Sequence, residues 1–154
     1  VAYAAEALVG EQKGKRNTKG IIYVTLHGLV WSTVVAVVYS LIFLVWGTEI
    51  ISMITDQPTL QIEMKSYLIF VYCLPIIAHW CFFFDGVFVG LTRAKAMRNS
   101  MLFCGLAVYF PAFWVFLSYG NMGLWMAMLL FLLFRGISLG CYFIYLCRTG
   151  KVAV

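Results

Sequence analysis

Long apolar stretches without charge are the feature that most restricts the folds open to this chain. Residues 21–46 contain no Asp, Glu, Lys or Arg, and a helix needs only about 20 such residues to cross the hydrocarbon core of a bilayer. The chain of 154 residues is 64% hydrophobic and 11% charged, whereas a soluble domain is about 45–50% apolar and about 25% charged. A soluble chain of this length could not bury so much apolar surface in one core. The sequence therefore predicts an all-α membrane protein, built as a bundle of transmembrane helices.

Four full transmembrane spans are expected, at residues 21–46, 63–92, 100–117 and 124–147. Residues 1–12 are small and apolar with helical character, so we interpret them as the end of a preceding helix. The chain is therefore expected to be a piece of a larger protein. Residues 50–55 are expected to form a short interfacial helix, and Pro58 is expected to begin a new element.

The charges of the loops alternate along the chain. Positive side chains gather in residues 11–19, in residues 93–99 and in the C-terminal tail. Residues 47–65 are instead mainly acidic, and residues 118–123 carry no charge. Because positive charge accumulates in cytoplasmic loops, the three basic segments are predicted to face the cytoplasm. The net charge of +5 has the same explanation, and without a nucleic-acid-binding motif no nucleic-acid partner is expected.

Two acids are candidates for an ion or substrate site. Asp85 lies within an apolar span, about 10 Å from its cytoplasmic end by helical rise. A carboxylate in such a place is costly and usually marks an ion or substrate pathway, although a structural acid paired with a buried base is the alternative. Glu6 lies four residues before Gly10 and would fall in the same half of the membrane. It is either a second acid in the same cavity or an interfacial residue that reaches the headgroups.

Other polar or bend-forming residues also fall within the spans. Arg135 lies near the centre of the last span, so it needs a partner, and a structural ion pair is favoured over a substrate contact. Pairing with Asp85 is possible but not favoured, because Arg135 lies about 19 Å from the cytoplasmic end. Pro75 removes a backbone hydrogen bond and is a candidate hinge. His27 and His79 are expected to bond to neighbouring helices rather than to relay protons.

Catalytic and metal-binding motifs are absent from the sequence. There is no P-loop, GxSxG or HExxH sequence, so no enzymatic activity is expected. The five cysteines form no CxxC pair and no His lies at zinc-ligand spacing, so we expect free thiols and no metal.

Three stretches together resemble one family of membrane transporters. They are AAEALVGEQKGKRN at residues 4–17, DGVFVGLTRAKAMRNSM at residues 85–101 and GNMGLWMAMLLFLLFRGISL at residues 120–139. They resemble the C-terminal half of the MATE (multidrug and toxic compound extrusion) transporters, most closely the DinF-like branch. The second stretch, an acid and two glycines followed by T-R-x-x-x-M-R-N, is the most specific of the three.

This resemblance implies a twelve-helix transporter of two pseudo-symmetric six-helix lobes. The chain would supply the C-terminal portion of the C-terminal lobe, from the end of the eighth helix to the twelfth. The implied function is secondary antiport, exporting cationic or toxic organic compounds in exchange for protons or sodium ions. The resemblance places Asp85 in the tenth helix, where related transporters carry a functional acid. It also matches Glu6 to an acid common in the eighth helix of DinF-like members.

The same resemblance implies the partners and the location. No cofactor is expected beyond the coupling ion, H⁺ or Na⁺. The expected partners are the missing N-terminal lobe, small organic cations and the lipid bilayer of the bacterial inner membrane, with the C-terminus in the cytoplasm. Two alternatives remain: a lipid or oligosaccharide flippase of the same superfamily, and a structural membrane subunit that transports nothing.

Overall fold

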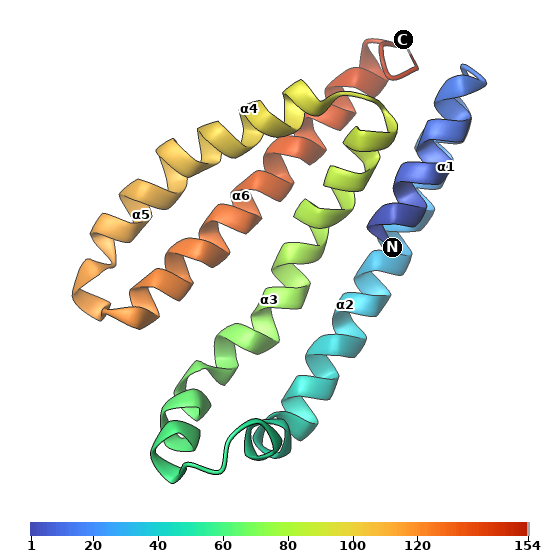
Figure 1. The fold of residues 1–154 in the computed structure, drawn as a ribbon. Helices are drawn as coiled ribbons and strands as arrows, with labels where there is room; N and C mark the ends of the chain where they lie inside the picture. Colours follow the sequence, from blue (N-terminus) through green and yellow to red (C-terminus); the bar gives the residue numbers. More distant parts are fainter. Residues whose placement is uncertain (154) are drawn as a thin grey trace.

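The computed structural model describes residues 1–153, and every regular element in that part of the chain is helical. In order these are α1 (Ala2–Gly14), α2 (Thr18–Ile54), α3 (Pro58–Gly90), α4 (Ala94–Cys104), a π-helical stretch (Gly105–Tyr109), α5 (Phe110–Val115), a 3₁₀ turn (Leu117–Tyr119) and α6 (Asn121–Arg148). Figure 1 shows the long helices running side by side as an elongated bundle. The predicted all-α class is confirmed.

Local sequence explains where the longest helices begin. The Asn17 side chain accepts a hydrogen bond of 3.0 Å from the Gly20 amide and so caps α2. Pro58 occupies the first turn of α3, where a proline costs no helical hydrogen bond. The expectation that Pro58 begins a new element is confirmed.

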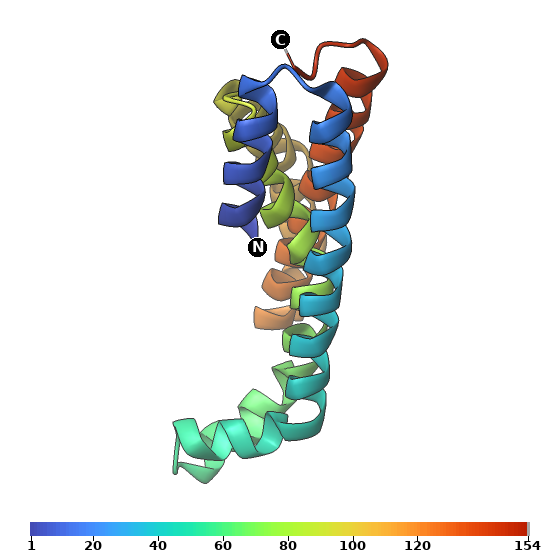
Figure 2. The same cartoon turned by 90° about the vertical axis from the view of Figure 1, so that its right-hand side faces the viewer.

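The connection between α2 and α3 differs from the expected separate interfacial helix at residues 50–55. α2 continues without a break to Ile54, because no helix-breaking residue interrupts it before that point. Figure 2 shows the last turns of α2 and the first turns of α3 bent to one side of the bundle axis. Residues 50–54 are thus the bent end of α2 rather than an element of their own.

Three helices in residues 1–153 are long and apolar enough to cross a membrane, namely α2, α3 and α6. The expected span at 100–117 is divided instead between α4, the π-helical stretch and α5. Pro111 explains the division, because it has no amide hydrogen and its ring displaces the carbonyl one turn earlier. The Phe110 amide bonds to the Gly105 carbonyl, five residues back, as π-helical geometry requires. A fourth span therefore stays a prediction.

Helix α3 lies at the centre and packs against α1, α2 and α6. Two glycines of α3 permit a close approach of α1. A Cβ added to Gly86 would lie 2.3 Å from the Ala2 carbonyl oxygen, and one added to Gly90 would lie 2.6 Å from the Glu6 carbonyl oxygen. The face of α3 that carries Gly86 and Gly90 is therefore a close helix contact.

The three basic segments meet at one end of the bundle. The α1–α2 connection, the α3–α4 connection and the C-terminus lie together at that end in Figure 1, opposite the α2–α3 and α5–α6 connections. Lys13 Nζ donates to the Leu91 carbonyl at 2.7 Å and to Thr92 Oγ1 at 2.6 Å. Arg93 Nη2 donates to the Lys151 carbonyl at 2.7 Å. This arrangement fits the predicted topology, in which the basic end is cytoplasmic.

Candidate functional site

A buried ion pair joins the two central charged residues of the bundle. Arg135 Nη2 on α6 donates to Asp85 Oδ1 on α3 at 2.8 Å. The side chains are 11% and 20% exposed, respectively. A charge withdrawn from water this far is tolerated when an opposite charge and hydrogen bonds compensate it. Each charge therefore has an opposite charge beside it, and the structural ion pair expected for Arg135 is present.

Helix counting placed Arg135 and Asp85 at different depths, but the packing of α6 against α3 brings the two side chains together. Gly136 packs against α3, since its added Cβ would lie 3.2 Å from the Cys81 amide nitrogen. Measured from that contact, α6 runs about 3 residues further than α3 before it ends, or roughly 4.5 Å of helix. Counting from the helix ends therefore overstated the separation, and the long Arg135 side chain spans the remainder.

Cys81 completes the surroundings of the guanidinium group. Arg135 Nη1 donates to Cys81 Sγ at 3.2 Å. Within residues 1–153, Arg135 Nε is buried without a hydrogen-bond partner. Cys81 lies one helical turn before Asp85, so α3 presents both acceptors to the same side chain. Cys81 was not predicted as a site residue. Its position four residues before Asp85 nevertheless places both side chains on one face of α3.

Glu6 lies apart from this pair. Its side chain is half-buried on α1, and among residues 1–153 it makes no side-chain hydrogen bond or ion pair. Its backbone carbonyl faces Gly90, at the tightest contact between α1 and α3. The two candidate acids therefore differ in their contacts. Asp85 is paired within the bundle, whereas Glu6 on α1 is unpaired among residues 1–153.

Pro75 and His79 of α3 line a cavity, which lies beside α2. Pro75 lies inside α3 without ending it. One turn later, His79 Nε2 lies 3.1 Å from Thr33 Oγ1 of α2, and Nδ1 lies 2.7 Å from the Ile76 carbonyl oxygen. The cavity has a volume of about 310 Å³. The expected bond from His79 to a neighbouring helix is confirmed, and the cavity lies where a hinge at Pro75 would act.

His27 does not behave as expected. Its Nδ1 lies 2.9 Å from the Tyr23 carbonyl oxygen of its own helix, and its ring lies 3.9 Å from the Tyr23 ring. Helix spacing explains the difference, because the carbonyl four positions back lies within reach of the ring, and the His27 side chain is exposed.

Comparison with known proteins shows the family of this chain. The MatE family model matches residues 1–115, a stretch that includes both candidate acids and ends before Arg135. The chain belongs to the MatE family. This MatE chain is a segment of a membrane transporter, a class whose members are typically not enzymes.

One relative shows how much of a longer protein this chain covers. The MatE chain is 37% identical to DNA damage-inducible protein F of Escherichia coli (strain K12) over 141 residues. The aligned part covers 90% of this chain and 30% of that protein. No solved structure matches the chain significantly.

Proposed function

We propose that this chain is the C-terminal part of a two-lobed secondary antiporter. The antiporter exports cationic or otherwise toxic organic compounds in exchange for protons or sodium ions. Membership of the MatE family supports the transporter class, and the small share of the E. coli relative that the chain covers supports a longer protein. The remaining lobe would come from sequence outside these 154 residues.

The observation that carries the proposal is the Asp85–Arg135 pair. Arg135 Nη2 occupies only Oδ1 of Asp85, and within residues 1–153 no hydrogen bond reaches Oδ2. The carboxylate is also the more exposed partner, at 20% against 11%. One oxygen of Asp85 therefore pairs with an internal cation, while the other oxygen stays open to a visiting ion.

This geometry makes Asp85 a point of competition. A proton bound at the carboxylate removes its charge and weakens its hold on Arg135; a sodium ion or an organic cation competes directly with the guanidinium. A ligand shifts a conformational equilibrium only by its different affinity for the two states. Coupling then follows if the inward- and outward-facing states differ in how closely Arg135 approaches Asp85.

Two further residues have supporting roles in the proposal. Glu6, unpaired on α1, offers a second carboxylate for the substrate or ion on the side of α3 that α1 covers. Pro75 supplies the bend, since α3 lacks the hydrogen bond that an amide at this position would make. We place the protein in the bacterial inner membrane with the basic end and the C-terminus in the cytoplasm.

The test is exchange transport by the full-length protein in proteoliposomes. We expect Asp85→Asn to abolish ion-driven uptake of a fluorescent organic cation, because Asn keeps the shape but neither binds nor releases a proton. Asp56→Asn is the matched control, since Asp56 is an exposed acid in the α2–α3 connection. Unchanged uptake by the Asp85→Asn protein would remove Asp85 from the mechanism.

A further inference from the structure

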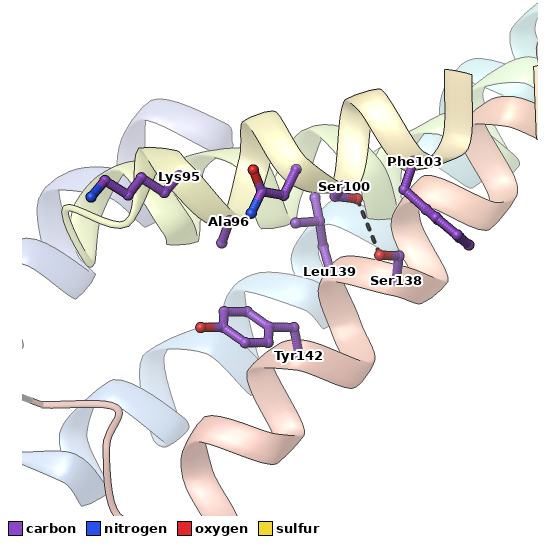
Figure 3. A pocket seen from close by; sticks show the side chains of 8 residues that line it. Lys95, Ala96, Ser100, Phe103, Ser138, Leu139 and Tyr142 are labelled. Atoms are coloured by element: carbon purple, nitrogen blue, oxygen red, sulfur yellow. Dashed lines mark hydrogen bonds between the residues drawn. The ribbon is translucent and has the colours of Figure 1, made fainter. Parts of the chain in front are cut away.

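A cavity opens between α4 and α6 at the basic end of the bundle. Its volume is about 360 Å³, and Figure 3 shows the side chains from both helices that line it. Its polar lining consists of Lys95, Asn99 and Ser100 from α4 and Ser138 and Tyr142 from α6. None of these residues belongs to the Asp85–Arg135 pair, so the cavity needs its own explanation.

The polar groups of this cavity are hydrogen-bond donors. Asn99 Oδ1 already accepts from Arg98, at 3.3 Å from Nη2, so its amide nitrogen is the group left for a ligand. Ser100 Oγ donates to Ser138 Oγ at 3.2 Å, which leaves the Ser138 hydroxyl hydrogen to donate elsewhere. Lys95 adds an ammonium group, and no carboxylate lines the cavity. Such a set of donors around one cation selects an anion with several acceptor oxygens.

The position of the cavity narrows the choice of anion. Lys95 lies in the first turn of α4, where the helix dipole adds positive potential. Phe103 lines the other end, two helical turns or about 12 Å deeper. The headgroup layer of a bilayer is only about 5–7 Å thick on each side. The cavity therefore begins at headgroup level and ends in the hydrocarbon, where Phe103 and Leu139 supply apolar walls.

We propose that this cavity binds the phosphate of an anionic phospholipid from the leaflet at the basic end of the bundle. Lys95 pairs with the phosphate, the Asn99 amide and the Ser138 and Tyr142 hydroxyls donate to its oxygens, and Phe103 contacts the start of an acyl chain. A dissolved phosphate ion has no part that needs these apolar walls. Basic pockets between transmembrane helices are known to suit anionic headgroups.

The bound lipid links α4 to α6, the helix that carries Arg135. Ser138 lies three residues after Arg135, so both occupy one face of α6. A headgroup held between α4 and α6 therefore stabilises the helix that presents Arg135. This lipid site stands independently of whether Asp85 carries the coupling.

The test is native mass spectrometry of the full-length protein titrated with phosphatidylglycerol and phosphatidylcholine. We expect the wild-type protein to prefer phosphatidylglycerol, and Lys95→Gln to reduce its affinity about fivefold, the effect of one lysine at a membrane surface. Tyr142→Phe removes one donor while keeping the ring that stacks on Phe88 at 5.7 Å, and we expect a smaller loss. Lys19→Gln is the matched control, because Lys19 is an exposed lysine at the same end outside the cavity.

Three results would overturn the lipid site. One is an equal preference for phosphatidylglycerol in the Lys95→Gln and wild-type proteins. Another is an equal loss in the Lys19→Gln and Lys95→Gln proteins, which would show general surface attraction. The third is displacement of the bound lipid by millimolar inorganic phosphate, which would show a site for a dissolved anion.

Discussion

Removing both members of the Asp85–Arg135 pair should lower the free energy of unfolding by less than the sum of the two single removals, because each single removal leaves an unpaired charge inside the protein. Asp85→Asn leaves a guanidinium with 11% exposure and no opposite charge, and breaking a buried pair in this way costs about 3–5 kcal/mol. Arg135→Gln leaves a carboxylate with 20% exposure, so we place its cost at the lower end of the same range. The double variant contains no charge at either position.

The double variant should therefore be destabilised by less than either single variant, and by much less than the sum of about 7 kcal/mol that the two single effects would give. The assay is the free energy of unfolding of the full-length protein, from denaturation of detergent-solubilised samples with SDS. Asp56→Asn serves as the control and should change this free energy by less than about 0.5 kcal/mol. If the two single effects simply add, Arg135 and Asp85 do not act as a pair, and the description of the site is wrong.

Two further predictions concern packing and topology. Gly90→Ala should reduce the free energy of unfolding by about 1–3 kcal/mol, because its Cβ would meet the Glu6 carbonyl at 2.6 Å; Gly105→Ala, with no atom within 4 Å of its Cβ, should be neutral. Equal stability of the two variants would contradict the close α1–α3 contact. Single cysteines placed at Asn121 and Gly150 in a cysteine-free background should react from opposite sides of the membrane, with position 150 reached from the cytoplasm. Labelling of both from one side would contradict the topology.

The helical class and the grouping of loops were predictable because they depend on composition and on loop charge. Runs such as residues 21–46 satisfy their backbone only as helices, and the basic segments at 11–19 and 93–99 must share one side if the number of crossings between them is even. The close contact at Gly86 and Gly90 was also visible, since glycines four residues apart lie on one helix face.

The partner of Arg135 and the form of the third span required the structure. Relative heights of parallel helices depend on packing contacts such as Gly136 against Cys81, which no single-helix count contains. A proline such as Pro111 can be accommodated by a kink, a break or a π-helical stretch, and the packing of the neighbouring helix decides among them. The lipid-headgroup cavity was missed for a similar reason, because its donors come from two helices about 40 residues apart in sequence.

The most direct test of the central claim is ion release on substrate binding. The full-length protein in weakly buffered detergent solution, mixed with a fluorescent organic cation, should release close to one proton or one sodium ion per substrate bound, read by a pH indicator or a sodium-selective electrode. The account predicts that Asp85→Asn abolishes this release, while Arg135→Gln changes its pH or sodium dependence. Full release by the Asp85→Asn protein would contradict the account.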